Sequence, residues 1–197
     1  MAVRARPGER YTVRRNLFSF FGTSFQVLNS EGEPVAFCRQ KALRLKEDIR
    51  LYTDKTRSEE LLRLAARQVI DFSATYDVRM PEGDVLCSFR RAGMKSTFLR
   101  DSWKVFDAED VQIATIQERG SFLPFFRRFF GGLAVLFPQT FDVERTQDGT
   151  HIATFRQHFN PFVYRMGLAI HTDDVALDEL TLIGGVALIA AIEGRRS

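Results

Sequence analysis

Hydrophobic and polar positions alternate in one short pattern that occurs four times along the chain. Each copy consists of an aromatic residue, any residue, a valine, an acidic turn and a short return strand. Because residues two apart lie on the same face of a strand, the aromatic residue and the valine of each copy are expected to enter the core together. The four pairs are Phe25 and Val27, Tyr76 and Val78, Trp103 and Val105, and Phe141 and Val143. The pattern predicts four antiparallel β-hairpins, with return strands at 35–37, 85–89, 113–116 and 152–155.

The turns of these hairpins share an acidic character. In three copies a glycine follows the acidic residue, at Gly32, Gly83 and Gly149, and glycine supplies the positive φ that tight hairpins need. The third copy has three acidic residues within 107–110 and no glycine. The turn chemistry therefore supports a hairpin in each copy, and in the third copy the turn has to form without a glycine.

Further β-like runs lie between the hairpins, at residues 43–52, 69–72 and 162–170. They bring the expected number of short strands to about twelve, which is more than one flat sheet comfortably holds. A sandwich or a closed barrel is the natural architecture for so many strands, and closure also removes exposed strand edges. The fold class expected is mainly β, a closed antiparallel barrel.

One helical interruption is predicted over residues 56–68. Thr56 and Glu59 have the spacing of a capping box, in which two side chains satisfy the free N–H groups of a helix start. Three leucines at 61, 62 and 64, together with Ala65, then give an apolar face. We expect this helix to be structural.

An uncharged run spans residues 180–192, with acidic residues before it and Arg195 and Arg196 after it. This charge order suits a helix dipole, and Gly194 is typical of a C-cap. The run is apolar on every side, so all faces of the helix are expected to be buried. It rises only about 20 Å, whereas the hydrocarbon core of a bilayer is about 30 Å thick. The run predicts a helix enclosed by the strands of the same chain, with a monotopic or oligomerising tail as the alternative.

The composition is that of a packed domain. Of the 197 residues, 45% are hydrophobic and 27% charged, and 19 phenylalanines favour strands and an apolar core. The formal net charge of +3 is too small to demand a polyanionic partner, so nucleic acid binding is not expected. Cys38 and Cys87 are too few for a disulfide framework and predict free, buried thiols in a cytoplasmic protein.

The order of these elements resembles the tubby C-terminal-like superfamily, and within it the LURP-one-related and phospholipid-scramblase-like branch. The resemblance extends over residues 11–192 and rests on the hairpin at 25–37, the strand at 43–52, the run at 69–78 and the terminal helix around 182–187. It implies a twelve-stranded barrel threaded by the C-terminal helix. We expect a basic N-terminal arm over 1–10 and one barrel domain over 11–197, with its helix at about 175–193.

The functions of that superfamily are less uniform than its fold. Tubby domains bind phosphoinositide head groups through basic residues, scramblases are assigned calcium-dependent lipid movement, and many bacterial and plant members have no settled activity. The scramblase branch has an acidic segment before its last helix, but the matching residues 159–167 contain no carboxylate. The resemblance therefore implies no calcium site in this chain, and fold alone does not assign a function.

The sequence contains no catalytic signature. It has no Walker loop, no Gly-x-Gly-x-x-Gly and no Gly-x-Ser-x-Gly. His151, His158 and His171 lie in the last third without cysteine or acidic ligands at zinc spacing. We expect no enzyme activity, no cofactor and no metal site.

The most distinctive candidate for a functional segment lies within residues 121–132. Its aromatic rings flank an arginine pair between Pro124 and two glycines. Such rings could insert at a membrane interface while the arginines meet phosphates. The alternative is that the segment covers one end of the barrel, with its rings inward. The candidate residues are Phe125, Phe126, Arg127, Arg128, Phe129 and Phe130.

Basic residues form a second candidate, in equivalent parts of two successive hairpin units. They could line adjacent strands as one cationic face for an anionic head group, or be solvated outward positions. They are Arg39, Lys41, Arg44, Lys46, Arg90, Arg91, Lys95 and Arg100. The N-terminal arm could also contact anionic lipid or nucleic acid, or be a solvated, partly disordered terminus; its arginines are Arg4, Arg6, Arg10, Arg14 and Arg15.

These features favour a non-enzymatic barrel that binds anionic phospholipid head groups or another ligand at a membrane surface. A protein-interaction or regulatory scaffold is the first alternative, and scramblase-like lipid movement is the second. The expected location is cytoplasmic, peripheral at the inner face of a membrane.

Overall fold

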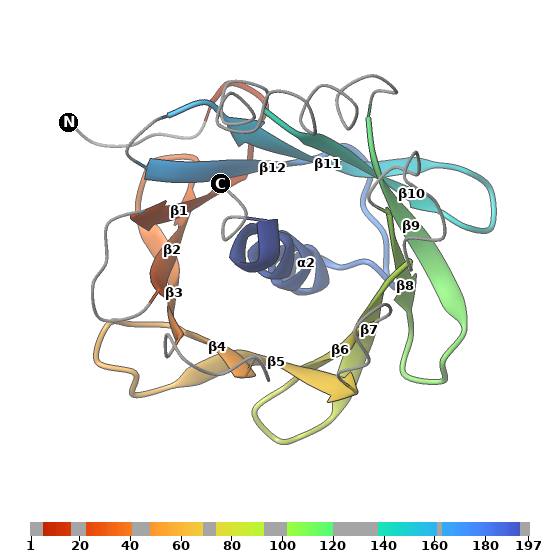
Figure 1. The fold of residues 1–197 in the computed structure, drawn as a ribbon, viewed down its shortest axis with the longest axis horizontal. Coiled ribbons are helices and arrows are strands. Elements are labelled where there is room, and N and C mark those ends of the chain that lie inside the picture. Colours follow the sequence, from red (N-terminus) through yellow and green to blue (C-terminus); the bar gives the residue numbers. More distant parts are fainter. Residues whose placement is uncertain are drawn as a thin grey trace, which may run out of the picture.

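Twelve strands form one closed antiparallel barrel around a single helix in the computed structural model (Figure 1). Each strand pairs with its neighbours in sequence, and β1 closes the barrel by pairing with β12. The structure describes residues 6–16, 23–40, 48–68, 74–92, 102–119, 138–160 and 163–193. The elements are β1 (Tyr11–Asn16), β2 (Thr23–Asn29), β3 (Pro34–Gln40), β4 (Asp48–Tyr52), β5 (Glu60–Gln68), β6 (Thr75–Arg79), β7 (Val85–Arg91), β8 (Ser102–Phe106), β9 (Gln112–Glu118), β10 (Thr140–Arg145), β11 (His151–His158), β12 (Val163–Ile170) and α2 (Glu179–Glu193).

The four predicted hairpins are confirmed as β2–β3, β6–β7, β8–β9 and β10–β11. Their four valines are fully buried, as are Phe25, Trp103 and Phe141, whereas Tyr76 is partly buried and packs against the core. In every copy the strand register shifts directly after the valine. Such β-bulges increase local twist, which helps a sheet to close into a barrel.

The pair β4–β5 is a fifth hairpin of the same kind, which the sequence pattern did not predict. Its register shifts between Leu51 and Tyr52, after an inward pair formed by Ile49 and Leu51 in place of an aromatic residue and a valine. The predicted strand at 43–52 is confirmed for 48–52. Its first part and the predicted run at 69–72 lie outside the described residues.

The helix predicted over 56–68 is wrong, because residues 60–68 form strand β5. Leu62 and Leu64 are fully buried with a period of two, and β5 pairs with β4 on one side and β6 on the other. Pairing on both sides outweighs the modest helical preference of leucine and alanine. The capping-box residues lie in the turn before the strand, where Thr56 bonds Asp54 and not a helix N–H group.

The turn of the third hairpin contains no glycine, and an aspartate adopts the positive φ angle in its place. Gly32, Gly83 and Gly149 have positive φ angles of 87°, 104° and 71°, as the turn chemistry predicts. In the third hairpin the positive φ falls on Asp110, at 61°. Aspartate is among the few residues that adopt this left-handed conformation at low cost, so an acidic residue replaces glycine there.

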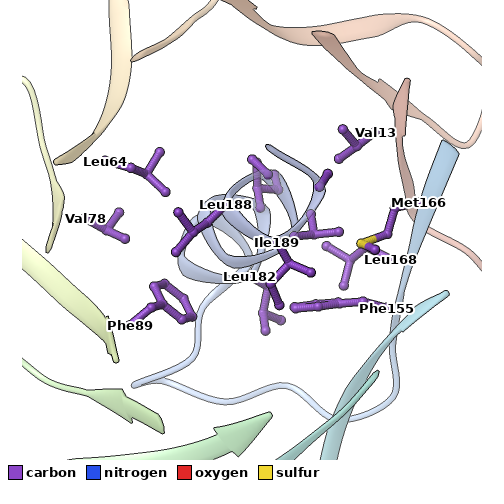
Figure 2. Close-up of a cluster of buried hydrophobic side chains, with 14 of the residues drawn as sticks. Val13, Leu64, Val78, Phe89, Phe155, Met166, Leu168, Leu182, Leu188 and Ile189 are labelled. Carbon is purple, nitrogen blue, oxygen red and sulfur yellow. The ribbon is translucent and has the colours of Figure 1, made fainter. Parts of the chain in front are cut away.

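Helix α2 lies inside the barrel, as predicted from its uncharged run (Figure 1). Residues 181–191 are buried, and Asp178 caps the helix by accepting a hydrogen bond from the Thr181 N–H at 2.7 Å. Figure 2 shows Leu182, Leu188 and Ile189 of the helix surrounded by strand side chains. Those labelled are Val13, Leu64, Val78, Phe89, Phe155, Met166 and Leu168. Within the described part of the chain, no helix is long and apolar enough to cross a membrane.

Candidate anion-binding site

Most of the candidate residues predicted from the sequence lie outside the described residues. This is so for Lys41, Arg44, Lys46, Lys95, Arg100, Phe125, Phe126, Arg127, Arg128, Phe129 and Phe130, and Arg39 is placed in β3 without its side chain. The strand ends that flank these segments can be placed. Because the barrel is an up-and-down meander, the ends of β3, β7 and β9 and the starts of β4, β8 and β10 lie at the same rim. The segments thus connect strands at one end of the barrel, the end at which α2 terminates.

Among the basic candidates in the two hairpin units, Arg90 and Arg91 are the two whose side chains are described. Arg90 donates a hydrogen bond to the Thr75 hydroxyl at 3.3 Å, and its guanidinium lies 4.2 Å from the centre of the Phe106 ring. The guanidinium of Arg91 lies 5.7 Å from the centre of the buried Trp103 ring. Consecutive residues of a strand point to opposite faces, so these two arginines do not contribute to one cationic face.

A different group of arginines gathers on the outer face of the barrel where β1 meets β12. Arg14 and Arg165 are direct partners in the antiparallel register, so their side chains leave the sheet side by side. Burial lowers the pKa of Arg165, and the charges of Arg14 and then Arg6 lower it further. Three guanidinium groups therefore share one patch, which we call the arginine cluster.

The arginine cluster has no carboxylate partner among the described residues. The Nε atoms of Arg14 and Arg165 are buried and make no hydrogen bond. Most other outward arginines of the barrel are paired. The pairs are Arg50 and Arg63 with Asp48, Arg67 and Arg79 with Asp77, Arg119 with Asp142, and Arg145 with Asp174. The cluster is thus a site of uncompensated positive charge, and an anion is the species that would complete it.

The N-terminal segment that carries Arg6 is held against β12. The side chain of Glu9 lies on Gly167, where an added Cβ would overlap its carboxyl group. The Glu9 Oε1 atom is 2.6 Å from the His158 Nε2 atom, and both side chains are buried. The Arg10 N–H also donates to the Leu168 carbonyl at 2.8 Å. Residues 6–10 of the basic arm are therefore an ordered part of the barrel surface and not a solvated tail.

Sequence reasoning placed Arg6 and Arg14 in the basic arm but gave no role to Glu9, Arg165 or Gly167. The closure of β1 on β12 joins residues from opposite ends of the chain, and no local pattern signals that pairing. The alternation within 163–168 would have placed Arg165 on the outer face. Its partner strand could not be read from the sequence.

The two cysteines are free and buried, as predicted. Burial raises the pKa of Cys38 and of Cys87 to about 12 in each case. A thiol with that pKa is almost entirely protonated near neutral pH, which disfavours a nucleophilic role. In the described part of the chain, no group of three or more His, Cys, Asp or Glu side chains could hold a metal ion.

A closed twelve-stranded antiparallel barrel that encloses its own C-terminal helix defines the class of tubby-like barrel proteins. A comparison with protein families narrows the class further. The model of the LURP-one-related family matches residues 35–175, and the chain belongs to this family. A comparison with the curated proteins finds no match.

Proposed function

We propose that this LURP-one-related barrel binds anionic phospholipid head groups at a membrane surface, without catalysis, through the arginine cluster. The observation that carries the proposal is the Arg14–Arg165 pair, two cations directly opposite each other, with buried Nε atoms and no carboxylate partner in the described part of the chain. Arginine is well suited to phosphate, because its planar guanidinium offers parallel donors to two oxygens.

The energetics favour a bound anion. A buried N–H group without a partner costs about 1–3 kcal/mol, and like charges directly opposite on adjacent strands cost up to about 1 kcal/mol more. A phosphate that accepts hydrogen bonds from both guanidinium groups would offset both costs. The binding energy would thus come largely from relief of a cost built into the free protein.

The surroundings of the cluster support a membrane as the source of the anion. Phe159 follows the last residue of β11, is 47% exposed, and is adjacent in sequence to His158, the register partner of Arg165. An exposed aromatic ring beside a cationic patch is typical of peripheral membrane binding. The aromatic candidate segment at 125–130 connects strands that end at this same rim, and its membrane contact stays a prediction.

Vesicle co-sedimentation tests the proposal. Vesicles of phosphatidylcholine with and without phosphatidylserine are compared for the wild type, for R14Q/R165Q and for a charge-matched control, R57Q/K104Q. The two side chains of the control are exposed and bond no carboxylate among the described residues. A hydrogen bond to a charged group contributes about 1.5–3 kcal/mol, so loss of the shared phosphate contact in R14Q/R165Q should weaken binding by roughly tenfold or more. Equal pelleting on both kinds of vesicle, or equal losses in variant and control, would contradict the proposal.

The alternatives predict other outcomes for the same protein. A protein-interaction scaffold would lose a partner in R14Q/R165Q while its weak binding to vesicles stays unchanged. Scramblase-like lipid movement would appear as exchange of labelled lipid between the leaflets of proteoliposomes. No feature among the described residues favours either alternative over head-group binding.

A further inference from the structure

A second cationic feature lies on the outer face of β9–β12, where residues 6–9 of the N-terminal segment form part of its lining. It is a groove of about 370 Å³, within the size range of small-ligand sites. Arg6, Arg119, Arg156, His151, His171 and Thr154 line it. The groove shares Arg6 with the arginine cluster but does not include Arg14 or Arg165, so its function would go beyond head-group binding and can be tested separately.

A buried threonine organises the floor of the groove. The Thr154 hydroxyl lies 3.0 Å from His151 Nε2, 3.0 Å from His171 Nε2 and 3.3 Å from Asp142 Oδ1. A hydroxyl has one proton and two lone pairs, and an ionised carboxylate can only accept. All three contacts are satisfied when Thr154 donates to Asp142 and accepts an Nε2–H from each histidine. Nδ1 of each ring then remains as the nitrogen that can take up a second proton.

The two carboxylates next to the groove, those of Asp142 and Glu9, already have partners. Asp142 receives two hydrogen bonds from Arg119, at 2.7 and 2.6 Å, and Glu9 is bonded to His158. Arg156 is exposed and has no hydrogen-bond or ion-pair partner among the residues that the structure describes. With both histidines neutral, three arginines face two carboxylates and the local charge is +1; with both protonated it is +3.

We propose that this groove binds a phosphomonoester group, a chemistry shared by soluble phosphate esters and by phosphatidic acid. Phosphate carries close to two negative charges near neutral pH and three oxygens that each accept hydrogen bonds. Those oxygens match the guanidinium of Arg156, the remaining donors of Arg6 and Arg119, and a proton on Nδ1 of either histidine. A carboxylate has two oxygens and one charge, so it would leave part of this donor set unused.

Binding is coupled to proton uptake by His171. Its ring centre lies 4.5 Å from that of His151, and an anion in the groove would favour the charged form of His171. The groups that face His171 are His151, Thr154 and Asp142 on β10 and β11, Arg119 after β9, Arg156 on β11, and Arg6 and Glu9 in the N-terminal segment. Burial and the proximity of His151 lower the pKa of His171, and Asp142 opposes that change. An anion in the groove should therefore bind more tightly as the pH falls.

The three histidines of the chain allow a direct test by NMR, because each contributes one imidazole Hε1 signal. Inorganic phosphate is titrated into the full-length protein at constant ionic strength, with H171Q used to assign the signals. We expect saturable shifts of the His151 and His171 signals and a smaller response of His158. Sulfate, whose charge is constant near neutral pH, isolates the histidine contribution and should bind more tightly at pH about 6 than at about 7.5.

Arg156 provides the decisive variant, because its exposed side chain should be replaceable without loss of fold. R156Q should weaken phosphate binding by about tenfold or more, while K104Q, which removes one exposed charge elsewhere on the barrel, should not. If phosphatidic acid vesicles bind in an R156Q-sensitive way and inorganic phosphate does not, the phosphate belongs to a lipid; the reverse assigns it to a soluble ester. No saturable response to either probe, or equal losses in R156Q and K104Q, would overturn the proposal.

The same variants separate this site from the proposed function. In R14Q/R165Q, the histidine signals should still respond to phosphate, although binding to phosphatidylserine vesicles is weakened. R156Q should keep binding to those vesicles. Loss of one property alone therefore refutes only the corresponding site.

Discussion

Two adjacent glycines of α2 should respond in opposite ways to the same substitution. A Cβ at Gly184 would lie 3.4 Å from Val78 and 3.6 Å from Leu62, which is ordinary van der Waals contact. A Cβ at Gly185 would lie 2.9 Å from the tip of the Phe89 ring and 3.5 Å from Phe155. Phe89 is buried in a close-packed core, so it cannot move aside without disturbing its neighbours.

The magnitudes follow from these distances. Alanine is favoured over glycine in a helix by about 1 kcal/mol, and this gain is the same at both positions. G184A should therefore stabilise the protein by roughly 1 kcal/mol. In G185A the gain is offset by overpacking, which costs about 1–3 kcal/mol. Because the helical preference cancels, the difference between the two variants, about 1–3 kcal/mol, measures the steric cost alone.

Urea denaturation followed by the fluorescence of the single tryptophan, the buried Trp103, measures this difference. The expected order of unfolding free energy is G184A above wild type and G185A below G184A. Equal stabilities of the two variants, or G185A as the more stable, would refute the packing of this face of α2 against β7 and β11.

Three further predictions concern the surface and the thiols. G167A should displace Glu9 from β12, break its contact with His158 and cost about 1–3 kcal/mol, so limited trypsin digestion should cleave at Arg6 and Arg10 faster than in the wild type; an unchanged rate would speak against the contact. Because the pKa of His171 is lowered in the folded state, the unfolded chain binds the proton more readily, and stability should fall as the pH drops below the ordinary histidine value of 6.5. Urea denaturation in buffers free of phosphate and sulfate should show a smaller loss for H171Q, and an identical loss would exclude this residue as a cause. Cys38 and Cys87 should react with a thiol reagent only on unfolding, since both are buried with a pKa of about 12; rapid labelling of the native protein would contradict their burial.

Local patterns in the sequence were sufficient for the hairpins and for the central helix. An aromatic residue, a valine and an acidic turn specify a hairpin by contacts within a dozen residues, and the run at 180–192 specifies burial by lacking charge on any face. The strand β5 was missed because leucine and alanine satisfy helical and strand patterns alike. Only its pairing with β4 and β6 decides between them.

The candidate sites depend on contacts that no local pattern contains. Arg14 and Arg165 become neighbours when β1 closes the barrel on β12, and His151 and His171 meet because both bond Thr154. The sequence pointed mainly to basic residues in segments that connect the strands, most of which lie outside the described residues. Among the described residues, the cationic groups that come together without carboxylate partners lie on the strands and in the N-terminal segment. Closure of the barrel, a long-range event, determines which charges are paired.

The arginine cluster is tested most directly by a double-mutant cycle on phosphatidylserine vesicles with R14Q, R165Q and R14Q/R165Q. If one phosphate bridges both guanidinium groups, each single variant should lose nearly as much affinity as the double variant, because removal of either partner breaks the bridge. Independent losses of about fivefold each, which multiply in the double variant, would indicate a diffuse surface charge and contradict a shared head-group site.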